Sequence, residues 1–236
     1  MAKIIGYGCS LKLRWLDKAA ELFQNQFSKQ RFKEELNEYL SSEIENTTRL
    51  RKTREILMHI WYYNDSEISA IREEAFRLLR KFPEYAPAIH LCLIYTAYPV
   101  FADICRYTGK LLQFQDEVTT HMLRQQLFDE WGERGSLEAI ARRVTLTLKN
   151  LGFLINEKRT RYKAKRIEVN DSDLVNFLLL TAMKTEGNEY YSFSALEQFN
   201  VLFPFKYHVS REQLIKDKRF SLNAFNTNLN VTVKRI

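Results

Sequence analysis

Apolar residues spaced three or four positions apart recur through the first 150 residues and predict a series of helices. The first is expected to begin at Ser10, whose side chain can cap it, and another begins at Asn46. A helix over residues 32–39 has few apolar anchors, so we expect it at the periphery. The next helix is capped by Asp65 or Ser66. Because the chain of 236 residues contains only seven Gly and four Pro, these helices together predict an all-α body.

The segment from Ala86 to Ala102 contains no Asp, Glu, Lys or Arg. Pro87 and Pro99 divide it, and proline is tolerated in the first turn of a helix but disrupts a helix interior. We therefore predict two short buried helices rather than a membrane span, followed by a further helical run over residues 107–114. The first residues show no signal peptide, so a cytoplasmic protein without a membrane partner is expected.

The pattern changes after residue 170, where short helices mix with alternating apolar residues. Asp171-Ser172-Asp173 is expected to cap a helix that ends at Gly187-Asn188. A helix, an extended segment, a helix and a strand hairpin are then predicted over residues 194–201, 206–209, 211–216 and 219–236. The chain is thus expected to comprise a helical body (1–117), a middle unit (118–170) and a small α/β C-terminal module (171–236).

The middle unit is predicted to combine two amphipathic helices with a β-hairpin. The first helix covers residues 118–131, and after a glycine-containing turn Ser136 caps the second, which ends at Gly152. A strand then turns near residues 158–161 and returns over 162–169. Helix, short turn, helix and hairpin is the order of a winged helix-turn-helix, in which the second helix lies in the DNA major groove.

Positive charge is concentrated in this middle unit. Between Arg142 and Arg166 there are nine Lys or Arg residues and one acid, Glu157, which gives these 25 residues a net charge of +8. The whole chain carries +7, so the rest of it, with 27 basic and 28 acidic residues, sums to −1. A localised excess of this kind is typical of a surface that binds a polyanion, although a Lys/Arg-rich run can also be a plain solvated face.

We predict two kinds of DNA contact from these cations. Arg142, Thr145 and Lys149 lie opposite the apolar face of the second helix, so they are expected to face the groove. The other cations are expected to hold phosphates: Arg143, Lys158, Arg159, Arg161, Lys163, Lys165 and Arg166. Because few amide side chains accompany them, only weak sequence preference is expected.

A second basic cluster, Arg49, Arg51 and Lys52, occupies the first turns of the helix that begins at Asn46. The helix dipole disfavours cations at a helix N-terminus. The cluster therefore indicates a second phosphate contact, or alternatively Glu45 and Glu55 neutralise part of its charge in solvent.

Catalytic and cofactor motifs were not found. The sequence has no glycine-rich phosphate-binding loop, no HExxH and no GxSxG, and acid pairs such as Glu73-Glu74 diverge by about 100° on a helix. Cys9, Cys92 and Cys105 lie in apolar or small-residue surroundings and are expected to be buried free thiols. The four His show no ligand spacing. We therefore expect a non-enzymatic protein without a metal or a cofactor.

Three segments resemble the BrxA family of bacteriophage exclusion (BREX) defence systems. They are TRLRKTREIL at Thr48–Leu57, PEYAPAIHLCLIYTAYPVFADI at Pro83–Ile104 and SLEAIARRVTLTLKNLGFL at Ser136–Leu154. The resemblance implies a helical fold related to NusB-like antitermination proteins, no enzymatic activity, and binding of double-stranded DNA together with other proteins of a phage-defence system.

The sequence thus predicts a mainly α protein in which a multi-helix, NusB-like bundle ends in a winged helix-turn-helix and a small α/β C-terminal module. The predicted function is non-enzymatic binding of double-stranded DNA as an accessory protein of phage defence. The alternatives are a winged-helix transcription regulator, an RNA-binding NusB-like antitermination factor, and a scaffold whose basic patch contacts an acidic protein.

Overall fold

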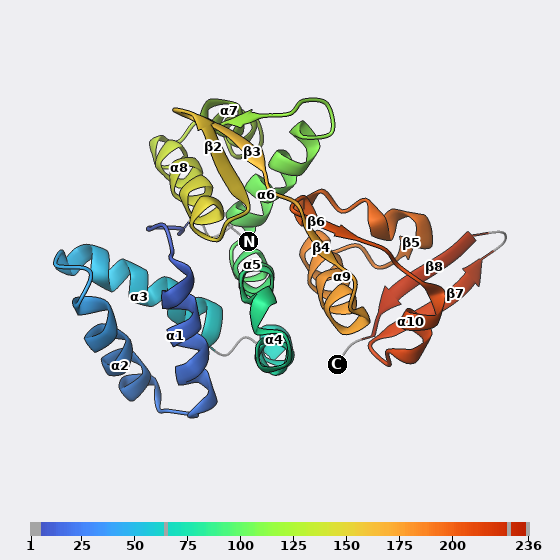
Figure 1. Ribbon diagram of the computed structural model, residues 1–236, viewed down its shortest axis with the longest axis horizontal. Coiled ribbons are helices and arrows are strands. Elements are labelled where there is room, and N and C mark those ends of the chain that lie inside the picture. Colours follow the sequence, from blue (N-terminus) through green and yellow to red (C-terminus); the bar gives the residue numbers. More distant parts are fainter. Residues whose placement is uncertain (1–5, 64–65, 226–227, 235–236) are drawn as a thin grey trace.

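Helices make up most of the structure, and a smaller strand-containing part lies at the C-terminal end (Figure 1). The structure is a computed structural model that describes residues 6–63, 66–225 and 228–234. Its N-terminal part consists of α1 (Leu13–Gln24), α2 (Lys29–Ser41), α3 (Thr47–Trp61) and α4 (Ser66–Lys81). The predicted predominance of helices is confirmed.

Side chains cap two of these helices. Ser28 accepts a backbone hydrogen bond at the start of α2, and Asn46 accepts one of 2.9 Å at the start of α3, as predicted. The prediction for α1 is wrong: this helix begins at Leu13 and not at Ser10, because the residues before it are extended. The predicted cap Asp65 lies outside the described residues.

Helix α2 lies at the outer edge of the N-terminal part, as expected, and buries one face (Figure 1). Its Phe32, Leu36 and Leu40 are completely buried. Their spacing of four residues places them on one face of the helix, and that face packs against α1 and α3. Three apolar side chains are therefore enough to bury one face of α2, because all three lie on the same side of the helix.

A buried arginine connects α4 to the end of α3. Arg72 is only 2% exposed, and its guanidinium donates hydrogen bonds to the backbone carbonyls of His59, Ile60 and Tyr63. The last carbonyls of a helix have no partner within the helix, and a cation there also interacts favourably with the helix dipole. Arg72 thus caps the C-terminal end of α3 and connects α4 to it.

Two apolar helices lie at the centre of the molecule. The short 3₁₀ helix η1 (Pro83–Tyr85) leads into α5 (Ala86–Ala97), and α6 (Pro99–Leu111) follows. Both have proline in the first turn, as predicted, but the run expected at 107–114 is a continuation of α6. Within the described residues no single helix is long and apolar enough to span a membrane. The pair Pro83–Ala97 and Pro99–Leu111 meets that test together but is bent by 119°.

The middle unit contains two helices and a three-stranded antiparallel sheet. Its elements are β1 (Val118–Thr119), α7 (Thr120–Trp131), α8 (Gly135–Asn150), β2 (Leu154–Lys158) and β3 (Arg161–Ala164). The sheet has the order β1-β3-β2, so the strand that precedes α7 pairs with the return strand of the hairpin.

The two ends of α8 differ in how well the sequence predicts them. Gly152 adopts a φ of 82°, and the N–H groups of Gly152 and Phe153 bond back to carbonyls of the last turn, as expected for a helix that ends at glycine. Ser136, in contrast, is not the cap. The helix already begins at Gly135, and the preceding Arg134 forms no capping hydrogen bond through its side chain.

The predicted return strand over 162–169 is two strands in the structure. After β3 the chain leaves the hairpin, and β4 (Ile167–Val169) pairs in parallel with β6 (Phe205–Tyr207). The Ile167 N–H donates to the carbonyl of Pro204 at 2.7 Å, which starts this second pairing. The prediction of one return strand is therefore wrong, because residues 167–169 pair with the distant strand β6 and not with the hairpin.

The C-terminal part is built around α9 (Ser172–Glu186), which Asp171 caps as predicted. The predicted helix over 194–201 is instead two 3₁₀ helices, η2 (Phe193–Glu197) and η3 (Asn200–Leu202). The remaining elements are β5 (Tyr191–Ser192), α10 (Arg211–Lys216), β7 (Phe220–Phe225) and β8 (Asn228–Val233). α10 and the β7–β8 hairpin were predicted, whereas the hairpin turn at 226–227 lies outside the described residues.

One cluster of buried residues extends from Tyr7 to Val231 and includes members of all three predicted parts. The closest approach between parts occurs where α6 meets η3. A Cβ atom at Gly109 would lie 2.2 Å from the backbone oxygen of Asn200, so only glycine fits there. The middle unit and the C-terminal part are thus packed onto the same central helices.

Candidate nucleic-acid interface

The exposed face of α8 is a stripe of residues three or four positions apart, namely Glu138, Arg142, Leu146 and Lys149. Arg142 and Lys149 are exposed, as predicted. Thr145 is only 1% exposed, and its hydroxyl donates to the carbonyl of Ala141 at 2.8 Å. The prediction that Thr145 faces a groove is therefore wrong.

The residue that occupies the stripe in place of Thr145 is Leu146, which is 42% exposed. The sequence offered a signal, because Leu146 lies four positions from Arg142 and three from Lys149, whereas Thr145 lies three and four positions from them. Both spacings are compatible with one helix face, so spacing alone does not distinguish the two residues. A threonine can satisfy its hydroxyl on a carbonyl one turn earlier, so it tolerates burial.

The inner face of α8 is fixed by the extended segment that precedes α1. The Thr147 hydroxyl lies 2.9 Å from the Tyr7 hydroxyl and accepts a hydrogen bond of 3.0 Å from the Leu11 N–H. One turn later, Asn150 donates to the carbonyl of Leu11 at 2.7 Å. Burial raises the pKa of the Tyr7 phenol, which therefore stays neutral. These contacts hold α8 rigidly while its outer stripe remains accessible.

The hairpin of β2 and β3 projects its turn into solvent. Arg159 and Thr160 form a two-residue connection between the paired residues Lys158 and Arg161. Thr160 has a φ of 69°, the left-handed conformation that tight hairpin turns require. Lys158 and Arg159 are exposed at the tip, so their charges extend from the body of the protein.

Two of the predicted phosphate-binding cations already have acidic partners. Arg161 lies 3.6 Å from the carboxylate of Glu117, and Lys163 lies 3.4 Å from that of Glu157. Glu117 directly precedes β1, and the pairing of β1 with β3 brings it beside Arg161. These contacts are solvent-exposed and therefore weak. They reduce the local positive charge, but both cations can still bind a phosphate.

Six exposed cations of α8, the hairpin and the two residues that follow it have no ion-pair partner within the described part of the chain. They are Arg142, Lys149, Lys158, Arg159, Lys165 and Arg166. Arg143 is half-buried and donates a long hydrogen bond of 3.5 Å to the carbonyl of Tyr7.

The second basic cluster lies at the start of α3. Arg49, Arg51 and Lys52 are exposed, and among residues 6–63, 66–225 and 228–234 none of them forms an ion pair. Arg54 differs, since its guanidinium is bound to the carboxylate of Glu55 and to the Asn37 side chain. The proposed neutralisation of the cluster by neighbouring acids thus applies to Arg54 and not to the three predicted phosphate contacts.

Arg51 and Lys52 share a hollow with α8, which we call the α3–α8 hollow. It has a volume of about 460 Å³, and Arg143 from α8 lines it together with them. The ring of Tyr98 also lines it, and so does His59, whose pKa burial and the nearby Arg72 lower, so the imidazole is neutral at pH 7. Three cations from two helices thus line one space together with a single acid, Glu55, which is already paired with Arg54. The excess of positive charge is suited to a phosphate group.

The thiols and acids offer no comparable site. Cys9, Cys92 and Cys105 are buried and free, as predicted, and burial raises the pKa of the Cys92 thiol to about 11. No group of three or more His, Cys, Asp or Glu side chains in the described ranges could hold a metal ion. The described residues do present a positively charged surface, formed by α8, the hairpin and the start of α3.

The chain was also compared with known proteins. It matches no protein-family model, no curated protein and no solved structure.

Proposed function

We propose that this protein binds double-stranded DNA through α8, the β2–β3 hairpin and the start of α3. The element order β1, α7, α8, β2, β3 and the sheet order β1-β3-β2 support a winged helix-turn-helix, with α8 as the helix that enters the major groove. At 16 residues α8 is about 24 Å long, and the major groove, about 12 Å wide, admits a helix. Its outer stripe is exposed, and one of the four residues, Glu138, is paired with Arg124 of α7 at 3.4 Å.

The observation that carries the proposal is the set of six exposed cations without ion-pair partners in the described residues. If each neutralises one phosphate, the logarithm of the affinity should fall with the logarithm of the salt concentration at a slope of about −5. Arg142 is the single residue of the stripe with a bidentate donor group, and Leu146 can contact a thymine methyl. We therefore propose weak sequence preference, with most affinity from the backbone.

The α3–α8 hollow extends this surface. The hollow lies along the first half of α8, from Ser136 to Arg143, whereas Lys149 lies near the C-terminal end of the helix. A duplex seated on α8 would have one strand near the hairpin and the other near α3. We propose that the hollow holds a phosphate of that second strand.

We also propose a non-enzymatic accessory role in a phage-defence (BREX) system, with other proteins of that system as partners. This part rests on the three resembling segments. In the structure they belong to α3, to the stretch from η1 to α6, and to α8, and residues of all three line the α3–α8 hollow: Arg51, Tyr98 and Arg143. The segments that carry the resemblance thus meet at the proposed DNA surface.

The test is the binding of a random-sequence duplex, measured by fluorescence anisotropy at several salt concentrations. We expect a slope near −5, and a slope shallower than about −2 would contradict phosphate binding by this surface. Competition with single-stranded RNA distinguishes the proposal from an RNA-binding protein, since the duplex should compete more strongly. A sharp motif in a selection from random duplexes would instead favour a sequence-specific regulator.

A further inference from the structure

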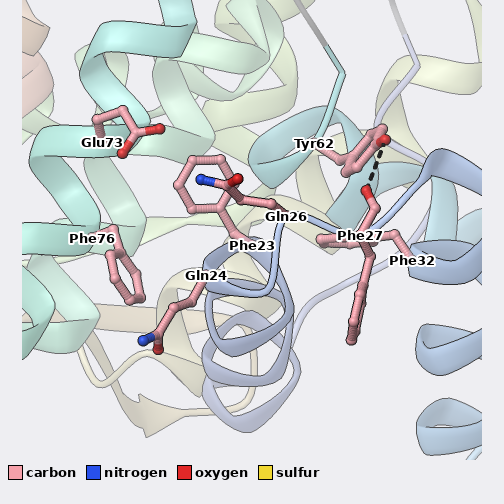
Figure 2. A pocket seen from close by; sticks show the side chains of 8 residues that line it. All are labelled: Phe23, Gln24, Gln26, Phe27, Phe32, Tyr62, Glu73 and Phe76. Carbon is pink, nitrogen blue, oxygen red and sulfur yellow. Dashed lines mark hydrogen bonds between the residues drawn. The ribbon is translucent and has the colours of Figure 1, made fainter.

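A pocket lined mainly by aromatic side chains opens where the ends of α1 and α3 meet α2 and α4 (Figure 2). Its volume is about 320 Å³, near the lower end of the range of about 300–1,000 Å³ for pockets that hold small molecules. Five rings line it: Phe23, Phe27, Phe32, Tyr62 and Phe76. In a chain with net charge +7, none of the residues that line it is a cation.

Four of the five rings are only half-buried, so apolar surface is left facing the pocket. Phe32 is fully buried and packs on Tyr62 with ring centroids 4.8 Å apart. The Tyr62 hydroxyl is already occupied, because it donates to the carbonyl of Phe27 at 3.1 Å. The rings thus present their aromatic surfaces rather than hydrogen-bonding groups, and aromatic faces attract cations.

The chain itself places a cation over one of these rings. The guanidinium carbon of Arg31 lies 4.4 Å from the centroid of Phe27. This contact shows that the rim of the pocket is open enough, and close enough to water, for a cation to approach an aromatic face.

A carboxylate lies on the α4 side of the same pocket. Figure 2 shows Glu73 and Phe76 on α4, across the pocket from Phe23 and Gln24 of α1. Glu73 is exposed and has no ion-pair partner within the described ranges. Arg77, one turn further along α4, is already paired with Glu74 at 2.8 Å. On its other side Glu73 lines a neighbouring hollow with Arg77, Arg80 and Lys81, but in the described residues it forms no ion pair with any of them. Its carboxylate thus accompanies the aromatic surfaces without a direct counter-ion.

We propose that this pocket binds a small organic cation, a quaternary or alkylated ammonium group, with the rings around the charge and Glu73 as its counter-ion. The pocket is separate from the DNA surface, because Tyr62 follows the C-terminal end of α3 whereas Arg51 lies near its N-terminus, about 16 Å away along the helix. The proposal therefore does not depend on DNA binding.

The test uses choline and its uncharged isostere 3,3-dimethylbutan-1-ol, which has the same shape without the charge. Binding to the full chain is followed by NMR titration of the methyl signals of each compound. We expect choline to bind at millimolar concentration and the isostere to bind at least about fivefold more weakly. Equal binding of both compounds, or no binding of choline, would overturn the proposal.

Two variants assign the binding to the pocket. Glu73→Gln should weaken choline binding about threefold, and Phe76→Leu, which keeps an apolar side chain but removes a ring, about fivefold. Glu84→Gln in η1 is the matched control, since it removes an exposed carboxylate outside the pocket and should leave the affinity unchanged. If Glu73→Gln and Glu84→Gln bind choline equally, Glu73 is not the counter-ion and the proposal fails.

A further titration identifies the source of the cation. N-acetyl-arginine amide presents the same charge as part of a polypeptide. Binding tighter than that of choline would indicate a protein side chain as the natural ligand, and weaker binding a free small molecule. Both results support a cation site. If choline and N-acetyl-arginine amide do not compete with each other for binding, they do not share the pocket, and the proposal is contradicted.

Discussion

Arginines in two regions of this protein have different surroundings. Around α4, α6 and β7 three arginines are matched to carboxylates: Arg77 with Glu74 and Asp173, Arg106 with Asp103 and Glu186, and Arg219 with Asp217 and Glu74. Along α8 and the hairpin, six exposed cations have no such partner in the described part of the chain. The first set joins helices and strands that are far apart in sequence, and the second joins nothing within the fold.

This difference separates charges that stabilise the fold from charges available to a ligand. Arg106 and Arg219 are largely buried, and their guanidinium groups connect α6 to α9 and β7 to α4. A buried pair that loses one partner leaves an uncompensated charge, so removal of these arginines should cost stability. Removal of an exposed cation without a partner should cost little stability and should affect only the binding of an anion.

The largest effect is expected at Arg72. Arg72→Ala removes a buried guanidinium and leaves three carbonyls of α3 without their hydrogen bonds, so the free energy of unfolding should fall by about 3 kcal/mol or more. Urea unfolding measures this change. An Arg72→Ala protein as stable as the wild type would show that buried cations of this fold are not structural, and the comparison between the two regions would fail.

A smaller effect is expected at the α3–α8 hollow. Replacement of both Arg51 and Lys52 by Ala should weaken duplex binding and flatten the salt slope by about two units, since each phosphate contact contributes about 0.9. The unfolding midpoint in urea should stay the same because neither residue has an ion-pair partner in the described chain. If the slope is unchanged, α3 lies outside the DNA surface.

Acid should weaken the ion pairs of the fold, both in the paired region (Asp173) and at Glu43, which Lys12 and Arg14 bind. Hydrogen bonding from Arg14 lowers the pKa of Glu43 to about 2, and hydrogen bonding from Lys81 lowers that of Asp173. A carboxyl group with a lowered pKa in the folded state adds stability above its unfolded value, about 4, and loses it as the pH falls toward the folded value. Urea unfolding should therefore become easier from pH 5 to pH 2.5, and less so in Glu43→Gln.

The smallest effects are expected within α8 itself. Thr145→Val should change duplex affinity less than about twofold, since the side chain is buried, whereas Leu146→Glu adds a like charge beside the phosphates and should weaken binding several-fold. Anisotropy titrations at one salt concentration are sufficient. If Thr145→Val weakens duplex binding more than Leu146→Glu does, Thr145 contacts the groove and Leu146 lies outside the interface.

Elements whose signals are local were predictable from the sequence. The Asn46 cap, the proline positions of α5 and α6, the glycine that ends α8 and the bounds of α10 each depend on a few neighbouring residues. The hairpin turn at 158–161 was also correct.

Features that depend on distant contacts were not predictable. Residues 6–12 form no helix and contact α8, where Tyr7 and Leu11 bond to Thr147, so no helix begins at Ser10. The second half of the predicted return strand pairs with β6, about 40 residues away in the sequence. The partner of Arg161, Glu117, lies outside the charge run and comes close only through β1.

The central claim, that the unpaired cations of the hairpin bind DNA phosphates, can be tested with two variants of equal charge. One replaces Lys158, Arg159, Lys165 and Arg166 with Ala. The control replaces four exposed cations elsewhere that have no ion-pair partner in the described residues: Arg80, Lys206, Lys216 and Lys218. Duplex binding is measured for both and for the wild type at several salt concentrations. The account predicts that the first variant loses affinity and that its salt slope flattens by three to four units, about 0.9 for each contact, while the control keeps a slope close to the wild-type value. Equal slopes for the two variants would contradict it.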